Sequence, residues 1–475
     1  MSLKRGRQNV SITSTVFVFL FLPLAVAIHK FIPEKIRNPF LLAASAVFYW
    51  LVSGKTLSCV LYLYAVTLIT WLIGIHIREA LKYGNSPVPQ MVAGIIINVA
   101  GLAFFKYFVI ASLPESLDFI HGIAVPIGIS FFTFKNISYL HEICSGEEPE
   151  SNFINYALYA TFFPQVMQGP IQTYKTFRTE LKNRVVTSVC ITGGLESFII
   201  GFGMKQLIAL KLTSLYSTAM NWGFDALSTP MAWLSVIAYS LCLYIDFCGY
   251  SYMANGISEM LGFTPCPNFD HPYISRSVSE FWRRWHISLG EWFKENIYFP
   301  MGGSRVSVPR YIINTLVVWI LTGIWHGTGF TFILWGLLSF ILVTLEHVSK
   351  KYEGPLCLLE RTKVSSHLYM IIYIPMSWAL FMSPNISEYA ELMKRLFPFG
   401  ETAEYVNNLD FVPYIKSCWP YLLAAVLLST SIPSKIWKKY RHMQYVAVPV
   451  LLAIFWFSVY FTVIYGSNPF MYVDF

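Results

Sequence analysis

The chain has 475 residues and a formal net charge of +8, with 55% hydrophobic residues and only 13% Asp, Glu, Lys and Arg. A soluble protein of this length needs a far more charged surface, so the composition excludes a soluble globular class. The basic residues lie in short loops between apolar runs and form no single stripe, which argues against nucleic-acid binding.

Apolar runs separated by Pro, Gly or charged residues follow one another along the whole chain. Runs of about 20 apolar residues match the thickness of a bilayer, and in lipid the backbone must satisfy its own hydrogen bonds, which favours helices. The sequence therefore predicts an all-α, polytopic transmembrane bundle. No linker is long or polar enough to separate folded parts, so residues 1–475 are expected to form a single domain. The candidate spans lie near 11–29, 39–53, 56–77, 91–112, 122–143, 152–170, 193–212, 229–248, 307–325, 329–348, 366–382, 418–433 and 444–466.

The distribution of Lys and Arg predicts an orientation. The loops at 30–37, 78–82 and 435–441 are basic, which places them in the cytoplasm and both termini outside. The basic residues at 4–7 favour the opposite orientation, which stays open. The first apolar run lacks a signal-peptide cleavage site. The eight cysteines form no CxxC pair and no Cys/His cluster, so no metal site is expected.

Two glutamines lie near the end of the run at 152–170. Gln165 and Gln168 lie between Pro164 and Pro170. Their amides could line a polar tunnel, or could satisfy the backbone groups that the two prolines leave unpaired.

Charged and aromatic residues crowd together between 246 and 305. Asp246 ends an uncharged run and could orient a histidine or pair with Arg283 or Arg284; of these, a structural pairing is favoured. Asn268 follows a Gly-Phe break shortly afterwards.

Ser277 and Glu280 have the spacing of a capping box, which predicts that a helix begins here. A continuous helix would place His286 on one face with Trp282, Leu289 and Phe293. Its tryptophans and basic residues suit a re-entrant or interfacial position. His286 could take part in chemistry, but in this segment alone a hydrogen bond to a backbone carbonyl is the favoured role.

The run from 311 to 345 contains no Asp, Glu, Lys or Arg, and it is too long for one crossing. His326 lies in its middle, close to Gly323, Gly327 and Gly329, which permit a helix break or the close approach of another segment. Ionisable groups inside membranes are costly and usually functional, and a neutral imidazole can accept a proton near neutral pH. The alternatives are a core histidine bonded to a neighbouring helix, or a translocation site in a transporter.

Four groups of segments resemble the membrane-bound O-acyltransferase family, in particular its bacterial branch of alginate O-acetyltransferase-like proteins. They are 131–134 with 137–139, 163–165 with 169–170, the block 246–305, and 323–327 with 334–336. Their order and spacing agree over most of the chain. Cys248, Asp270 and His271 depart from residues that are commoner in the family, which puts selectivity in doubt more than the chemistry.

The resemblance implies a ring of helices around a tunnel, with His326 as the catalytic residue and His286 matching a second family histidine of less settled role. Supporting or tunnel positions are expected at Asp246, Asn268, Trp285, Trp325, Arg283, Arg284, Gln165 and Gln168. No tightly bound cofactor is implied. The donor would be acyl-CoA, most simply acetyl-CoA, or an acyl-carrier thioester in the cytoplasm.

The resemblance further implies a multi-pass protein of the bacterial inner membrane, acting in O-acetylation during exopolysaccharide or alginate biosynthesis. The acceptor would be an extracytoplasmic polysaccharide or a partner protein that completes the transfer. D-alanyl transfer to teichoic acid from a carrier-protein thioester is the alternative within the same family, although the paired glycines of 298–305 favour the acetyl branch. A non-enzymatic transporter is the alternative of another class.

Overall fold

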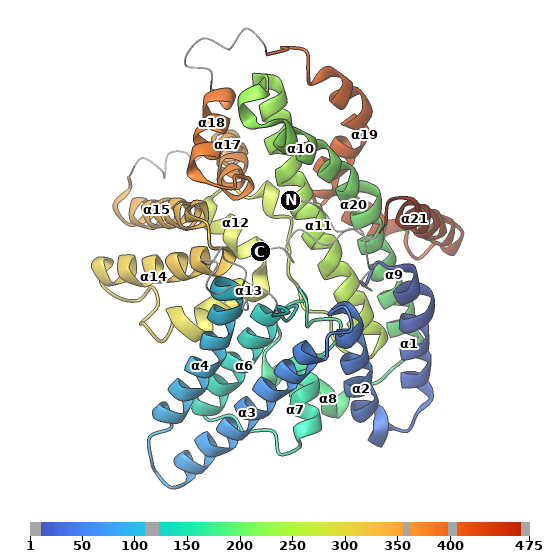
Figure 1. Cartoon of the computed structure of the whole chain (residues 1–475), viewed down its shortest axis with the longest axis vertical. Helices are drawn as coiled ribbons and strands as arrows, with labels where there is room; N and C mark the ends of the chain where they lie inside the picture. The colour runs from blue at the N-terminus through green and yellow to red at the C-terminus, as the bar shows by residue number, and fades with distance from the viewer. Residues whose placement is uncertain (1–10, 110–122, 355–361, 398–405, 467–475) are drawn as a thin grey trace. The chain divides into compact units, whose positions relative to one another are not determined.

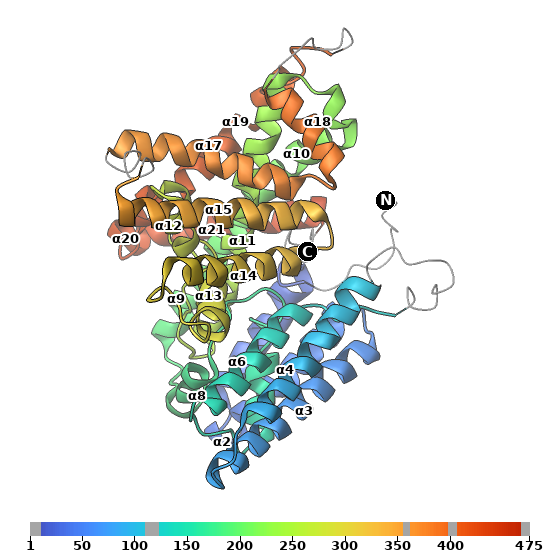
Figure 2. The same cartoon turned by 90° about the vertical axis from the view of Figure 1, so that its left-hand side faces the viewer.

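The computed structural model describes residues 11–109, 123–354, 362–397 and 406–466 (Figures 1 and 2). Within these ranges every regular element is a helix, which confirms the predicted all-α class. Among the described residues, eight helices are long and apolar enough to cross a membrane, and a further pair, Val412–Leu428 and Ile432–Tyr440, would add a ninth span bent by 77°. The eight are Leu57–Lys82, Val88–Val109, Ser188–Trp222, Thr229–Met260, Val308–His326, Phe330–Tyr352, Lys363–Met382 and Gln444–Tyr465.

The candidate span at 152–170 is wrong. Only Phe153–Thr161 is helical there, as α7, and turns follow it. Pro164 and Pro170 account for this, because proline lacks the N–H that continues a helix and restricts the residue before it. The basic residues at 4–7 lie outside the described residues, and the orientation stays a prediction.

The chain divides into two compact units, and the first contains residues 1–202, 250–266 and 459–474. That the chain forms a single domain stays a prediction. The elements of the first unit are η1 (Phe17–Phe21), α1 (Leu22–Phe31), α2 (Glu34–Val52), α3 (Leu57–Lys82), α4 (Val88–Ala103), η2 (Phe104–Val109), α6 (Ile129–Cys144), α7, α8 (Tyr174–Asn183) and nearly all of α9 (Ser188–Gly203).

Helices α3, α4 and α6 lie side by side in both views (Figures 1 and 2). A buried chain of hydrogen bonds joins them to one another and to α7. Asn98 donates to Thr70 Oγ1 (3.0 Å) and accepts from Asn136 (2.9 Å), and Tyr156 donates to Asn136 (2.8 Å). Because each amide is paired, the network fixes the register of four apolar helices that dispersion alone would leave free to slide.

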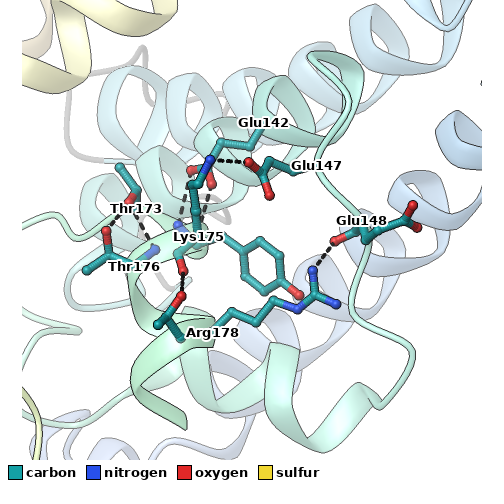
Figure 3. A network of polar contacts seen from close by, with 9 residues as sticks. Glu142, Glu147, Glu148, Thr173, Lys175, Thr176 and Arg178 are labelled. Atoms are coloured by element: carbon teal, nitrogen blue, oxygen red, sulfur yellow. Dashed lines mark hydrogen bonds and ion pairs between the residues drawn. The ribbon is translucent and has the colours of Figure 1, made fainter. Parts of the chain in front are cut away.

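Helix α8 is held at its start by acidic residues at the end of α6 and in the loop that follows α6 (Figure 3). Glu142 accepts from the main-chain nitrogens of Tyr174 (3.1 Å) and Lys175 (2.8 Å), while the Lys175 ammonium pairs with Glu147. Arg178 donates to the carbonyl of Glu148 (3.1 Å). A carboxylate at a helix N-terminus is stabilised by the unpaired N–H groups and the helix dipole, so Glu142 of α6 fixes the direction of α8.

The second unit contains residues 203–249 and 267–458. Its helices are η4 (Met204–Ala209), α10 (Leu210–Trp222), η5 (Phe224–Ala226), most of α11 (Thr229–Met260), η6 (Pro272–Ile274), α12 (Val278–Arg284), α13 (Ile287–Phe293), η7 (Lys294–Tyr298), α14 (Val308–His326), α15 (Phe330–Tyr352), α17 (Lys363–Met382), α18 (Ile386–Leu396), α19 (Val412–Leu428), α20 (Ile432–Tyr440) and most of α21 (Gln444–Tyr465).

Helices α14, α15 and α17 run side by side (Figure 2), and two glycines bring α14 and α15 together. A Cβ atom built on Gly336 would lie 2.6 Å from the carbonyl oxygen of Trp319, and one on Gly323 would lie 2.7 Å from that of Phe332. The close approach predicted from the glycines is confirmed for Gly323, and the break after His326 separates α14 from α15 as expected.

The helix predicted to run from 278 to 293 is in fact two helices. Ser277 caps α12 by accepting from Glu280 N (3.1 Å), as the capping box predicts. The chain then breaks, because His286 adopts a left-handed conformation with φ +45° between α12 and α13. A neighbouring extended segment compensates: Asp270 N donates to Arg284 O (3.0 Å) and Ile287 N donates to Asn268 O (2.9 Å). The predicted shared face of Trp282 and His286 is therefore wrong.

Candidate active site

His326 is the last residue of α14 and directly precedes the helix break. Its side chain is 3% exposed and lies among aromatic rings. The imidazole centroid is 4.4 Å from the ring of Trp325 and 4.9 Å from each of Trp335 and Phe381. Both of the last two meet the imidazole nearly edge to face, at 88° and 78°. The break places the imidazole at a helix end, and the aromatic rings restrict the directions in which it can point.

His286 is held by Asn268. Its Nδ1 lies 3.0 Å from Asn268 Oδ1, which also accepts from the hydroxyl (2.9 Å) and the main-chain nitrogen (3.3 Å) of Ser288. The ring packs edge to face against Phe247 at 4.7 Å. His286 lies outside the eight long apolar helices and is 2% exposed. Burial lowers the pKa of His286 to about 3, so its imidazole is neutral at pH 7.

One aromatic cluster lies between the two histidines within the second unit. It consists of Phe281, Trp282, Trp285, Trp335, Trp378 and Phe381. Trp285, adjacent to His286, lies 4.9 Å from Trp378, and Trp378 lies 6.1 Å from Trp335, which contacts His326. The predicted supporting residues Trp285 and Trp325 are each adjacent to one of the two histidines, and Trp285 belongs to the aromatic cluster.

Two residues that sequence reasoning missed support this arrangement. Glu346, on α15, accepts from the main-chain nitrogens of Val278 (2.7 Å) and Ser279 (2.8 Å), and so caps α12. Tyr373, on α17, accepts from the indole nitrogen of Trp282 at 3.2 Å. Glu346 directly follows the uncharged run at 311–345, and an isolated carboxylate at that place is the signal that could have found it.

Asp246 pairs with Lys205 rather than with Arg283 or Arg284. The carboxylate and the ammonium are in contact, and the two side chains are 2% and 5% exposed. Pairing as such is confirmed, but the predicted partners are wrong. Arg284 binds Glu280 (2.8 Å) and Asp270 (3.4 Å), and Arg283 is exposed. Lys205 and Asp246 both lie in long apolar helices, where water is not available to solvate a charge. Each buried charge is therefore stabilised by its partner.

Gln165 and Gln168 belong to the first unit. Gln165 accepts from the Lys135 ammonium (2.7 Å) and donates to Gln172 (3.2 Å), which in turn donates to Glu180 (2.9 Å). Gln168 is 1% exposed, and neither end of its amide has a hydrogen-bond partner among the described residues. The expected role of both amides in lining a tunnel stays a prediction, as does the tunnel itself.

The arrangement combines long apolar helices, an imidazole at a helix break, and a second imidazole fixed by an amide. It defines a polytopic membrane protein with a buried histidine site. A comparison with protein families matches residues 119–386 to the membrane-bound O-acyltransferase family. The chain belongs to this family, and it is an integral, multi-pass membrane O-acyltransferase. The transporter alternative is therefore set aside.

Proteins of similar sequence agree with this assignment. The chain is 34% identical over 400 residues to the probable alginate O-acetylase AlgI of Pseudomonas aeruginosa, covering 82% of this chain and 75% of the relative. It is 29% identical over 450 residues to the peptidoglycan O-acetyltransferase of Helicobacter pylori, covering 83% of each chain. The teichoic acid D-alanyltransferase of Bacillus subtilis is 27% identical over 282 residues, covering 54% of this chain and 69% of that one.

Proposed function

We propose that this O-acyltransferase moves an acetyl group from a cytoplasmic thioester to a hydroxyl of an extracytoplasmic polysaccharide, or to a partner protein that completes the transfer. Two relatives that each align with more than four fifths of this chain, 82% and 83%, are named as O-acetylating enzymes of alginate and peptidoglycan, both of them polysaccharide-based polymers. Acetyl-CoA or an acetylated carrier protein is the proposed donor, and no bound cofactor is needed for acyl transfer between a thioester and a hydroxyl.

The observation that carries the proposal is the position of His326 at the end of α14. In the proposed reaction His326 takes the proton of the acceptor hydroxyl while its oxygen attacks the thioester carbonyl. A C–O bond forms, the C–S bond breaks, and the imidazolium returns the proton to the leaving thiolate. A neutral imidazole suits this role because its ordinary pKa lies close to the working pH.

Of the two expected roles of His286, positioning a reactant and stabilising the oxyanion, we propose the first. The side-chain atom of Asn268 that faces His286 also accepts from Ser288 N, which can only donate, so this atom is the amide oxygen. Nδ1 of His286 must therefore carry a proton and donate to it. This tautomer leaves Nε2 as the acceptor of the ring. It therefore supports binding of a hydroxyl or thiol proton at Nε2, whereas oxyanion stabilisation would require the other tautomer.

The test uses purified full-length protein in lipid, a labelled acetyl donor, and release of free thiol as the readout. We expect His326→Ala to remain folded and to lower transfer by about 10²–10⁴-fold, the usual contribution of a general base. The matched control is His76→Ala, because His76 is an exposed histidine whose ring bonds the carbonyl of Leu72 in its own helix. Transfer by His326→Ala at the rate of the control would remove the proposal.

D-alanyl transfer remains the second candidate, and the narrower coverage of the D-alanyltransferase relatives argues against it. The two donors separate the candidates in one assay. A chain that consumes a D-alanyl carrier thioester and leaves acetyl-CoA intact would reassign the acyl group.

A further inference from the structure

Two arginines and a histidine meet in the first unit at the ends of three elements. His29 is in the last turn of α1, Arg37 is in the first turns of α2, and Arg184 directly follows α8. The charges of both guanidinium groups act on the His29 ring. None of the three takes part in the proposed acyl transfer.

Several donors of this group face no acceptor. His29 is 0% exposed, and neither of its ring nitrogens has a hydrogen-bond partner among the described residues. The same holds for Nε of Arg37 and for Nε and Nη1 of Arg184. Buried donors without partners destabilise the fold, and charged ones do so most, so native structures normally supply an acceptor at such a place.

Arg184 is oriented by its neighbours and not by a carboxylate. Its Nη2 donates to Asn38, which donates in turn to Asn155 at 2.8 Å, and its guanidinium stacks 5.0 Å from the ring of Phe263. Burial, followed by the like charge of Arg37, lowers the pKa of Arg184 to about 10. It is still protonated at pH 7, so the site keeps its positive charge.

The carboxylates of this region do not neutralise the site. Glu34 lies 3.6 Å from Arg37 but is itself 86% exposed, where its charge is screened. Glu147 pairs with Lys175 at the start of α8 (Figure 3). Glu148 pairs with Arg78, and Glu180 accepts from Gln172. Two guanidinium charges therefore face one exposed carboxylate, that of Glu34, next to the N-terminal end of α2, whose dipole adds further positive potential.

We propose that Arg37, Arg184 and His29 bind a phosphate group. Guanidinium forks fit phosphate oxygens in a bidentate manner, and a neutral imidazole adds one more donor. The large apolar side chains of Phe31, Val185 and Val189, which follow His29 and Arg184 closely in the sequence, are exposed. In a membrane protein such side chains face lipid, so the head group of an anionic phospholipid is the favoured source of the phosphate, and a soluble phosphate is the other.

The test uses the full-length protein in phosphatidylcholine nanodiscs, with phosphatidylglycerol added in one arm and inorganic phosphate in the other. The thermal midpoint and the number of phosphatidylglycerol molecules retained in native mass spectrometry are measured. We expect Arg184→Gln to bind the effective probe at least about tenfold more weakly, since the variant loses hydrogen bonds between a charged donor and the phosphate. Lys182→Gln removes the same charge from an exposed position on α8 and should bind as the unaltered protein does.

Arg184→Lys keeps the charge and serves where Arg184→Gln does not fold. It should lose a large part of the affinity, because an ammonium cannot form the paired bonds of the fork. A response to phosphatidylglycerol alone identifies a lipid head group, and a response to inorganic phosphate identifies a soluble ligand; either supports the site. Equal binding by Arg184→Gln, Arg184→Lys and Lys182→Gln, or no binding of either probe, would overturn it.

Discussion

The side-chain oxygen of Asn268 accepts from the main-chain nitrogen of Ser288, and it therefore can only accept from Nδ1 of His286, 3.0 Å away. One amide thus sets both the position and the tautomer of the His286 imidazole. The backbone of His286 is in the left-handed conformation. Non-glycine residues in that conformation cost free energy and persist only where their surroundings hold them.

Removal of this acceptor should slow transfer without preventing folding. We expect Asn268→Leu to lower the rate constant of transfer by about 10²-fold, the effect of a misplaced catalytic group, with a smaller change in KM. Asn268→Asp keeps an acceptor at the same place and should retain most of the activity. Asn385→Ala, which removes an exposed helix cap on α18, is the control. If the Leu and Asp variants behave alike, the hydrogen bond to His286 does not matter for the reaction.

Glu346 is expected to act as a positioning residue because it joins α15 to the start of α12. Glu346→Gln retains only one acceptor for the nitrogens of Val278 and Ser279 and loses the charge at the helix end. Hydrogen bonds to charged groups contribute about 1.5–3 kcal/mol, so we expect faster hydrogen exchange at both amides and slower transfer. Glu353→Gln, at the exposed end of α15, should change neither. Unchanged exchange in Glu346→Gln would contradict the assignment.

Lys205 and Asp246 should show strong coupling. Removal of one partner leaves an uncompensated buried charge, which costs about 3–5 kcal/mol, whereas replacing both with apolar residues of similar size can be neutral. We therefore expect Lys205→Met and Asp246→Leu each to lower the thermal midpoint, and the double variant to recover most of the loss. Additive losses in the double variant would show that the two charges do not stabilise each other.

Gly336 and Gly290 both lie within helices but differ in the space around them, so Gly290 is a control for Gly336. A Cβ on Gly336 would meet the carbonyl oxygen of Trp319 at 2.6 Å, while the nearest atom to one on Gly290 is 3.8 Å away. Gly336→Ala should separate α14 from α15 at a cost of about 1–3 kcal/mol, the usual range for overpacking, and also displace His326. Gly290→Ala should be neutral or stabilising, as alanine favours a helix. Equal thermal midpoints would mean that α14 and α15 tolerate the separation.

Local patterns predicted some features of the site correctly. The uncharged run and its glycines predicted α14, the break after His326 and α15, because apolar length and glycine act through nearby residues. The cap at Ser277 also follows from local chemistry. The break at His286 was missed, since it depends on backbone bonds to Asn268 and Asp270 far along the chain. The partners of Asp246 and the role of Glu346 were missed for the same reason: each is set by tertiary contacts.

The hydrogen bonds from Lys135 through Gln165 and Gln172 to Glu180 have a direction. An amide accepts at one end and donates at the other, so the order ammonium, amide, amide, carboxylate permits a single orientation for each glutamine. Turning either amide around would set donor against donor at one contact and acceptor against acceptor at the other. Lys135 and Glu180 are thereby connected through two oriented amides although they do not contact each other. The aligned amide dipoles stabilise both groups, and no ion has to move between them.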